Sequence, residues 1–81
     1  MRQALTNKAS PAVGKRLRDL RRFRGLKLRE VSEATGLGIS VICDIEQARR
    51  DVWRYQLERL ARVYGSSPGR VLLEAEKKNA A

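Results

Sequence analysis

Residues 26–50 read LKLREVSEATGLGISVICDIEQARR, and this stretch decides the fold. The spacing of its apolar residues predicts two short helices, Leu28 to Thr35 and Ile39 to Glu46. Gly36 ends the first helix because glycine takes a positive φ without strain, which leaves only a tight turn between the two. Ser32 is small enough for the helices to pack closely. Helices joined this tightly cross steeply, so the second projects from the surface and fits a groove about 12 Å wide, such as the DNA major groove.

Three further helices are predicted around this pair. The first begins at the N-cap Ser10 and ends near Arg24, where the following glycine supplies a left-handed stop. The fourth spans Arg54 to Tyr64. The fifth begins after Ser67 and frays from Glu76 onward.

Residues 10–76 are expected to form one helical domain between a flexible arm at 1–9 and a frayed tail at 77–81. A domain this small buries only about 60% of its unfolded surface, so self-association is expected to support it. The predicted core consists of Val13, Leu17, Leu20, Val31, Leu37, Ile42, Ile45, Leu57, Leu60, Ala61, Tyr64, Val71, Leu72 and Ala75, with either Ala34 or Thr35 added.

The chain carries 18 Lys and Arg residues against 9 Asp and Glu residues, a net charge of +9. Ten of these lysine and arginine residues lie between Met1 and Arg29, where Asp19 is the only acidic residue. The excess makes a polyanion the default partner. A run of charges also describes a solvated helix face, and composition leaves both interpretations open.

The sequence contains no histidine and a single cysteine, Cys43. Without histidine, no set of nucleophile, base and orienting residue can be assembled, so we expect no enzyme, no metal site and no cofactor. One cysteine forms no internal disulfide and fits a reducing cytoplasm. We interpret Cys43 as a small neutral filler, with a redox switch as the less favoured alternative. No apolar run is long enough to cross a membrane or to act as a secretory signal.

From Val13 to Leu73 the sequence resembles the Cro and phage-repressor family of helix-turn-helix regulators, also called the xenobiotic-response-element (XRE) family. The likeness runs without a gap through VGKRLRDLRRFRGLKLREV, ATGLGIS, IEQARR, LERLARVYG and SSPGRVLL. Glycines at Gly25, Gly36 and Gly65 match as well. The resemblance implies an all-α, five-helix, lambda-repressor-like DNA-binding domain.

The resemblance also implies a set of site residues, with Ile39 to Glu46 as the recognition helix. Base readout is implied for Ile39, Ser40, Asp44 and Gln47, with Gly38 and Cys43 on the same face. Phosphate contact is implied for Lys27, Arg29, Gly38, Arg49, Arg50 and Arg54. Arg21 and Glu46 match a partly buried ion pair of the family that orients the recognition helix.

The chain departs from the family at several of these positions. Where the family usually has a capping Ser or Thr and then Gln, this chain has Lys27 and Leu28. Gly38 replaces another usual Ser or Thr, although backbone N–H groups at both helix starts can still meet a phosphate. Ile39 can touch only a thymine methyl, and Asp44 accepts only from cytosine or else repels phosphate.

Together these observations predict a homodimeric, sequence-specific DNA-binding regulator. We expect a cytoplasmic repressor on a palindromic operator, encoded by a bacterium, a phage or another mobile element. Candidate dimer contacts are Trp53, Val71 and Leu72. For the tryptophan, core packing is the preferred interpretation and dimer contact the alternative. The alternative function keeps the fold but acts by protein contact, as an antitoxin or antirepressor-like module that binds its partner through Ile39, Val41 and Asp44.

Overall fold

The computed structural model describes residues 11–80, with the backbone alone at 77–80, and this range forms five α-helices. They are α1 (Pro11–Phe23), α2 (Leu28–Thr35), α3 (Ile39–Glu46), α4 (Arg54–Val63) and α5 (Pro68–Ala80). The predicted all-α, five-helix fold is confirmed. The predicted arm at 1–9, the Ser10 cap and Ala81 lie outside the described residues.

The helix limits follow the local signals closely. Both α2 and α3 have the predicted limits. α1 and α4 end just before the predicted positions, because Arg24 and Tyr64 already belong to the turns that close these helices. α5 continues beyond Glu76, where the sequence predicts fraying, as far as Ala80.

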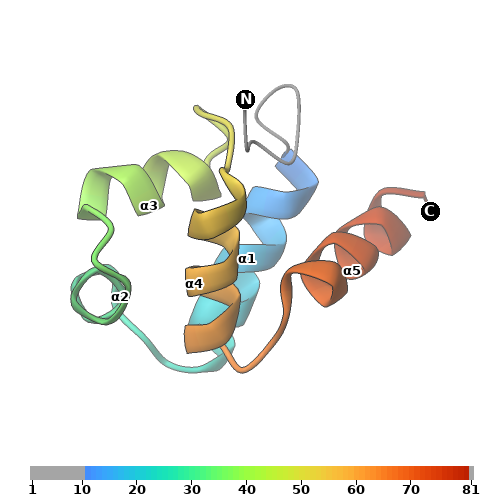
Figure 1. Ribbon diagram of the computed structural model, residues 1–81. Helices are drawn as coiled ribbons and strands as arrows, with labels where there is room; N and C mark the ends of the chain where they lie inside the picture. Colours follow the sequence, from blue (N-terminus) through green and yellow to red (C-terminus); the bar gives the residue numbers. More distant parts are fainter. Residues whose placement is uncertain (1–10, 81) are drawn as a thin grey trace.

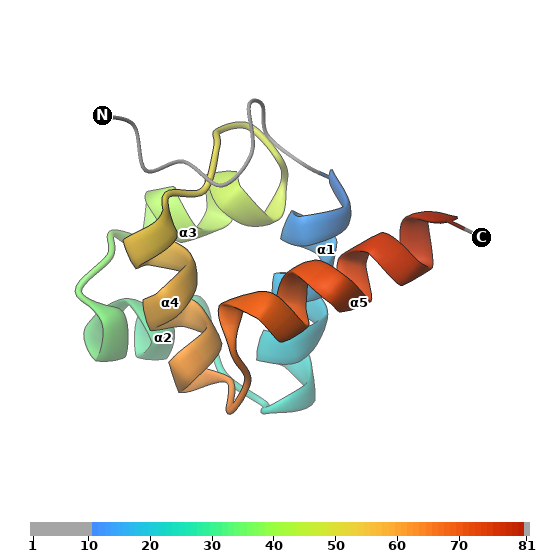
Figure 2. The same ribbon diagram turned by 45° about the vertical axis from the view of Figure 1, so that its right-hand side comes forward.

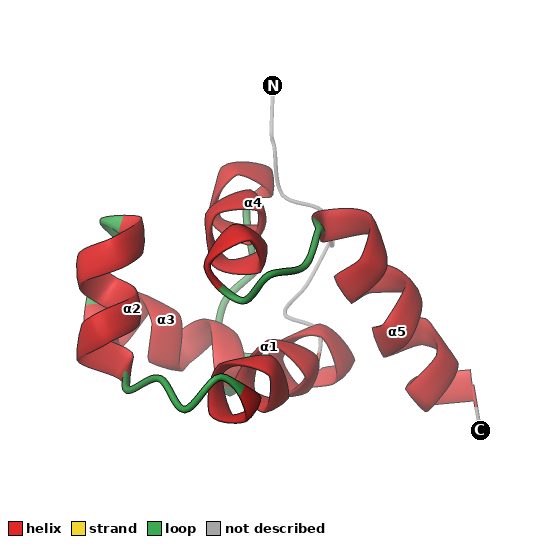
Figure 3. Cartoon of the chain, turned by 90° about the horizontal axis from the view of Figure 1, so that it is seen from below, coloured by secondary structure: helices red, strands yellow, loops and turns green. Residues whose placement is uncertain are grey.

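The helices pack around α1 and α4. α1 contacts α3 and α5, while α4 contacts α2 and α5. The short helices α2 and α3 also pack on each other, and α3 lies along an outer edge of the molecule (Figures 1 and 2). Seen from below, α5 lies on the opposite side from α2 and α3, with α1 and α4 between them (Figure 3). The α2–α3 pair therefore forms one side of the molecule.

The core agrees with the predicted set except at its margin. Leu20 and Leu72 pack against the core but are only partly buried. Thr35, and not Ala34, completes α2: it is 6% exposed, and its Oγ1 donates to the Val31 carbonyl at 2.7 Å. Val52 in the loop after α3 is a core residue that helical periodicity does not predict, because it lies outside a helix.

α1 and the end of α3 approach each other at Gly14, which is buried. A Cβ at this position would meet the backbone carbonyl oxygens of Ile45 and Glu46, the latter at 2.8 Å. Real Cβ atoms essentially never come this close to a backbone oxygen, so a side chain here would push α3 away from α1. Gly14 thereby fixes the position of the helix that forms the molecule's outer edge.

Candidate nucleic-acid interface

The inner side of α3 is anchored in the core by Ile42 and Ile45, which are 0% and 2% exposed. Its other side faces outward and carries the residues predicted for base readout: Ile39, Ser40 and Gln47 are exposed, and Asp44 is half-buried. Ile39 is 45% exposed, a large apolar side chain that no part of the described chain covers fully. The helix thus presents one apolar, one hydroxyl, one amide and one carboxylate group on one side.

The turn between α2 and α3 is tied by short hydrogen bonds. Gly36 has φ 79° and its N–H donates to the Ser32 carbonyl at 2.8 Å. The Ser32 hydroxyl donates to the Leu37 carbonyl at 2.6 Å. Ser32 therefore does more than leave space between the helices, because its side chain also fixes the residue that leads into α3.

The ion pair expected between Arg21 and Glu46 is present and bidentate. Arg21 Nε lies 2.7 Å from Glu46 Oε2, and Nη2 lies 3.0 Å from Oε1. The remaining guanidinium nitrogen donates to the Leu26 carbonyl at 3.0 Å. Only 12% of the Arg21 side chain and 5% of the Glu46 side chain are exposed. The hydrogen bond to Glu46 raises the pKa of the Arg21 guanidinium, against the opposing effect of burial. The pair links α1 to the last residue of α3 and so holds α3 in one orientation.

Residues 47–53, between α3 and α4, include Arg49 and Arg50 and are called the basic loop here. The turn that opens this loop is centred on Ala48. Ala48 has φ 59°. Among the described residues, it is the only one other than glycine with a positive φ. The Ala48 N–H donates to the Ile45 carbonyl at 3.1 Å, and the Arg49 N–H donates to the Asp44 carbonyl at 2.8 Å. These two bonds form a Schellman motif, which folds Arg49 back over the end of α3.

The Asp44 carboxylate on the outer face of α3 forms ion pairs with two arginines of the loop that follows. Its Oδ1 lies 3.4 Å from Nη1 of Arg49, and its Oδ2 lies 3.4 Å from Nη2 of Arg50. The predicted base reader thus contacts two of the predicted phosphate contacts. Sequence reasoning missed this cluster, although separations of five and six residues across a helix end could have suggested it.

The other predicted phosphate contacts surround α3. Lys27, Arg29 and Arg54 are exposed, and within residues 11–76 no ion pair joins them to an acid. Lys27 is the N-cap residue of α2, and its backbone N–H donates to the Glu30 side chain at Oε1, 2.8 Å away. Gly38 caps α3 with no side-chain acceptor, so the N–H groups of the first turn keep their capacity to bind an anion.

The three candidate dimer contacts differ in how exposed their side chains are. Val71 is 0% exposed, so its assignment as a dimer contact is wrong: a side chain enclosed by its own domain has no surface to offer a second copy. Trp53 and Leu72 are each partly buried and keep some exposed surface. Leu73 on α5 is 53% exposed and Phe23 at the end of α1 is 82% exposed, which adds two apolar side chains that the prediction did not include.

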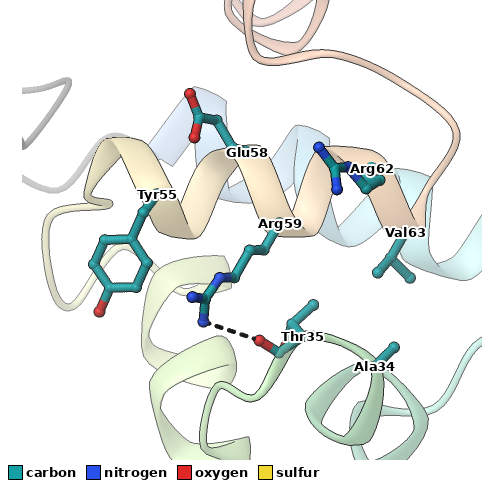
Figure 4. A pocket seen from close by; sticks show the side chains of 7 residues that line it. All are labelled: Ala34, Thr35, Tyr55, Glu58, Arg59, Arg62 and Val63. Carbon is teal, nitrogen blue, oxygen red and sulfur yellow. Dashed lines mark hydrogen bonds between the residues drawn. The ribbon is translucent and has the colours of Figure 1, made fainter.

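A groove of about 460 Å³ lies between α2 and α4 (Figure 4). Across it, Arg59 Nη1 donates to the Thr35 carbonyl at 3.2 Å, and its guanidinium lies 5.2 Å from the centre of the Tyr55 ring. Arg59 thus donates a hydrogen bond to a carbonyl at the C-terminal end of α2, where no partner within the helix is available, and links α2 to α4. This arginine had no role in the prediction, because nothing local to residue 59 indicates which carbonyl it meets.

The described residues 11–76 hold no group of acidic and cysteine side chains that could bind a metal ion. In the part of the chain that is described, no helix has both the length and the apolar composition needed to span a membrane.

Two short helices around a glycine turn, the second exposed beside a basic loop, define this chain as a helix-turn-helix DNA-binding domain. Residues 12–74 match the family model described as "Helix-turn-helix domain". The chain belongs to this family, and the predicted relationship to the Cro and phage-repressor (XRE) regulators is confirmed by the relatives that follow.

The HTH-type transcriptional regulator PuuR of Escherichia coli (strain K12) is 39% identical over 66 residues, which cover 82% of this chain and 36% of PuuR. The clp gene regulator ClgR of Corynebacterium glutamicum superposes with a TM-score of 0.82 at 31% identity, covering 86% of this chain and 74% of that one. The restriction-modification controller protein C.AhdI of Aeromonas hydrophila gives a TM-score of 0.72 at 28% identity, covering 75% and 92%. The chain spans about a third of the length of PuuR. These relatives are regulators and not enzymes, in agreement with the predicted absence of enzymatic activity.

Proposed function

We propose that the protein is a sequence-specific DNA-binding regulator that places α3 in the major groove. The observation that carries this proposal is the outward face of α3. This face lies next to a rim of exposed lysine and arginine side chains, and the Arg21–Glu46 pair holds it in one orientation. Phosphate contacts supply affinity and register, and the side chains of α3 read base edges. The rim consists of Lys27, Arg29, Arg49, Arg50 and Arg54, with the N–H groups that follow Gly38.

We further propose that the protein acts in the cytoplasm as a homodimeric repressor on a palindromic operator. A two-fold dimer places its recognition helices about 34 Å apart, one turn of DNA, and so requires half-sites with that spacing. Trp53 and Leu72, which keep exposed surface, support a contact between copies.

Selection of bound duplexes from a random pool at defined salt tests sequence specificity, because affinities without a stated salt concentration cannot be compared. A recovered motif with two related half-sites is the expected result. A protein that binds DNA and yet enriches no sequence would contradict specific readout.

Salt titration tests the rim. Arg49→Ala is expected to weaken binding to all duplexes alike and to reduce the slope of log K against log salt by about one, as expected for one lost phosphate contact. Arg70→Ala is the matched control, because Arg70 is an exposed arginine on α5, on the side away from α3. If Arg49→Ala and the parent have equal slopes of log K against log salt, the loop that carries Arg49 lies outside the interface.

Protein contact by α3 remains the second candidate function, and the exposure of Ile39 favours it. If Ile39 packs on a thymine methyl, Ile39→Ala loses about 1 kcal/mol at one base position and keeps its affinity for unrelated DNA. If α3 binds a protein, the same change leaves every DNA affinity unaltered and abolishes capture of that partner. Ile39→Ala therefore separates the two functions.

A further inference from the structure

We infer that Asp44 is a specificity-determining residue that acts by competing with DNA phosphates for Arg49 and Arg50. This inference rests on the proposed function and adds competition for two arginines to a residue that the sequence predicts to read a base or to repel phosphate. Its basis is the cluster at the end of α3, where one carboxylate contacts two guanidinium groups at 3.4 Å each.

The geometry of the helix end brings the three side chains together. Ala48 in the left-handed conformation closes the Schellman motif, and the Arg49 N–H donates to the carbonyl of Asp44 itself. The chain therefore turns back over α3, and Arg49 and Arg50 approach the Asp44 carboxylate from the loop side. The contact follows from the backbone path, so it is part of the free protein's structure and needs no ligand.

Exposure makes the cluster easy to open. The side chains of Arg49 and Arg50 are 63% and 45% exposed, and that of Asp44 is 28% exposed. Ion pairs this exposed are weak and are screened by salt. A DNA phosphate can therefore take over either arginine, because it offers a full negative charge with several acceptor oxygens.

Releasing the arginines has a consequence for Asp44. In the free protein the cluster presents two positive charges and one negative charge. When both arginines move to phosphates, the carboxylate faces the negative potential of the DNA without its partners. This repulsion opposes binding to every duplex. It is relieved where a base offers an amino group to the carboxylate, and cytosine N4 is the major-groove donor suited to it.

Asp44 therefore couples the phosphate contacts of the basic loop to the base that α3 meets. Duplexes with a suitable amino group retain both sets of interactions, whereas other duplexes keep the repulsion. The residue lowers affinity for DNA in general and, by lowering it unequally, raises the ratio between specific and nonspecific binding.

The variant Asp44→Asn tests this role because it keeps the size of the side chain and removes its charge. Binding to a random-sequence duplex is expected to tighten about fivefold, the effect of freeing two exposed pairs of this kind. Binding to the selected duplex is expected to change less, so the specificity ratio falls. Glu76→Gln is the matched control: it removes one negative charge from an exposed position on α5, which lies away from α3.

A double-mutant cycle separates competition from a general change in charge. In a background that carries Arg49→Gln and Arg50→Gln, Asp44→Asn is expected to lose the part of its effect on random DNA that comes from competition, and to keep the part that comes from repulsion between the carboxylate and the phosphates. If Asp44→Asn tightens binding no more than Glu76→Gln, or keeps its full effect in that background, the inference is overturned. If instead the parent protein binds neither random nor selected duplex, the proposed function itself fails, and this outcome is distinct because it does not depend on any variant.

Discussion

At the scale of single residues, the Arg21–Glu46 pair determines how the outer face of α3 is held. Its two hydrogen bonds of 2.7 and 3.0 Å join α1 to α3 in an almost enclosed site, unlike the exposed pairs around Asp44. Removing one partner from such a site leaves the other charge buried and unpaired. The pair is therefore expected to contribute to function through orientation and stability, without contacting DNA.

Glu46→Ala is expected to destabilise the fold by about 3 kcal/mol, a large part of the stability of a domain of this size. Urea denaturation measures the loss. The double variant Arg21→Met with Glu46→Leu removes both charges and is expected to recover most of it, because no charge is left unpaired. A Glu46→Ala protein as stable as its parent would mean that solvent reaches this pair freely.

Tyr64 gives the fold a dependence on alkaline pH. Burial raises the pKa of the Tyr64 hydroxyl well above its usual range, and the nearby Glu46 carboxylate raises it further. The hydroxyl is enclosed and has no hydrogen-bond partner among the described residues. Because the folded pKa lies above the unfolded pKa of about 10, the contribution of Tyr64 to stability is constant below that pH. It falls as the pH rises further, by up to about 1.4 kcal/mol per pH unit.

Tyr64→Phe is accordingly expected to be as stable as the parent at pH 7 and to lose less stability than the parent between pH 10 and 12. Thermal melts across this range provide the measurement. Tyr55→Phe is the control, since Tyr55 is 43% exposed and its removal should leave the alkaline decline in place. A parallel decline in the parent and in Tyr64→Phe would rule out this tyrosine as its cause.

At the scale of helices, the C-terminal end of α3 differs from those of α1 and α4. Gly25 and Gly65 close α1 and α4 with φ of 69° and 71°, whereas Ala48 closes α3 with φ 59°. A residue with a Cβ carries a cost of about 1–2 kcal/mol in the left-handed conformation. α3 therefore ends in a strained turn, the one that directs Arg49 and Arg50.

Ala48→Gly is expected to stabilise the protein by about 0.5–1 kcal/mol, because the relief of strain exceeds the greater flexibility of glycine in the unfolded chain. Gly25→Ala is the reciprocal variant and is expected to destabilise by about 1 kcal/mol. A Cβ at Gly25 would meet nothing within 4 Å, so only the backbone conformation is tested there. Denaturation midpoints compare the two, and a less stable Ala48→Gly would show that the alanine methyl group contributes more than its strain removes.

At the scale of the whole molecule, apolar surface remains uncovered on the side away from α3. Leu73 on α5 is 53% exposed, and Leu72 beside it in sequence is partly buried. Since Val71 is enclosed within its own domain, these neighbours are the apolar side chains that the described part of α5 would offer to a second copy. A dimer formed there would leave the α2–α3 side of each copy free, as binding of two half-sites requires.

Sedimentation equilibrium is expected to give a mass approaching twice 9.2 kDa as the protein concentration rises. Leu73→Asp should shift this equilibrium toward the monomer without loss of folding, because the residue is already exposed. Ile39→Asp, an equivalent change of the 45% exposed Ile39 on α3, which lies on the side away from α5, should not. Dimers that persist in Leu73→Asp would place the contact elsewhere, with Trp53 as the next candidate.

The sequence by itself determined the helices and the side that faces outward. Both α2 and α3 were predicted to the residue, because apolar spacing and Gly36 act within one or two helical turns. The Arg21–Glu46 pair could be expected from family resemblance, although no local signal in the chain connects two residues that are 25 positions apart. Apolar spacing and glycine stops, in contrast, are local signals, so one sequence is enough to interpret them.

Only the tertiary structure decided which groups meet across elements. The close approach at Gly14, the partners of Asp44 and the carbonyl bound by Arg59 all depend on how the helices pack. Val71 was misassigned for the same reason, since periodicity gives an apolar face without saying whether the chain itself or a second copy covers it. Packing joins residues as distant as Arg16 and Glu74, 58 positions apart, and such contacts arise from the combined shape of all five helices.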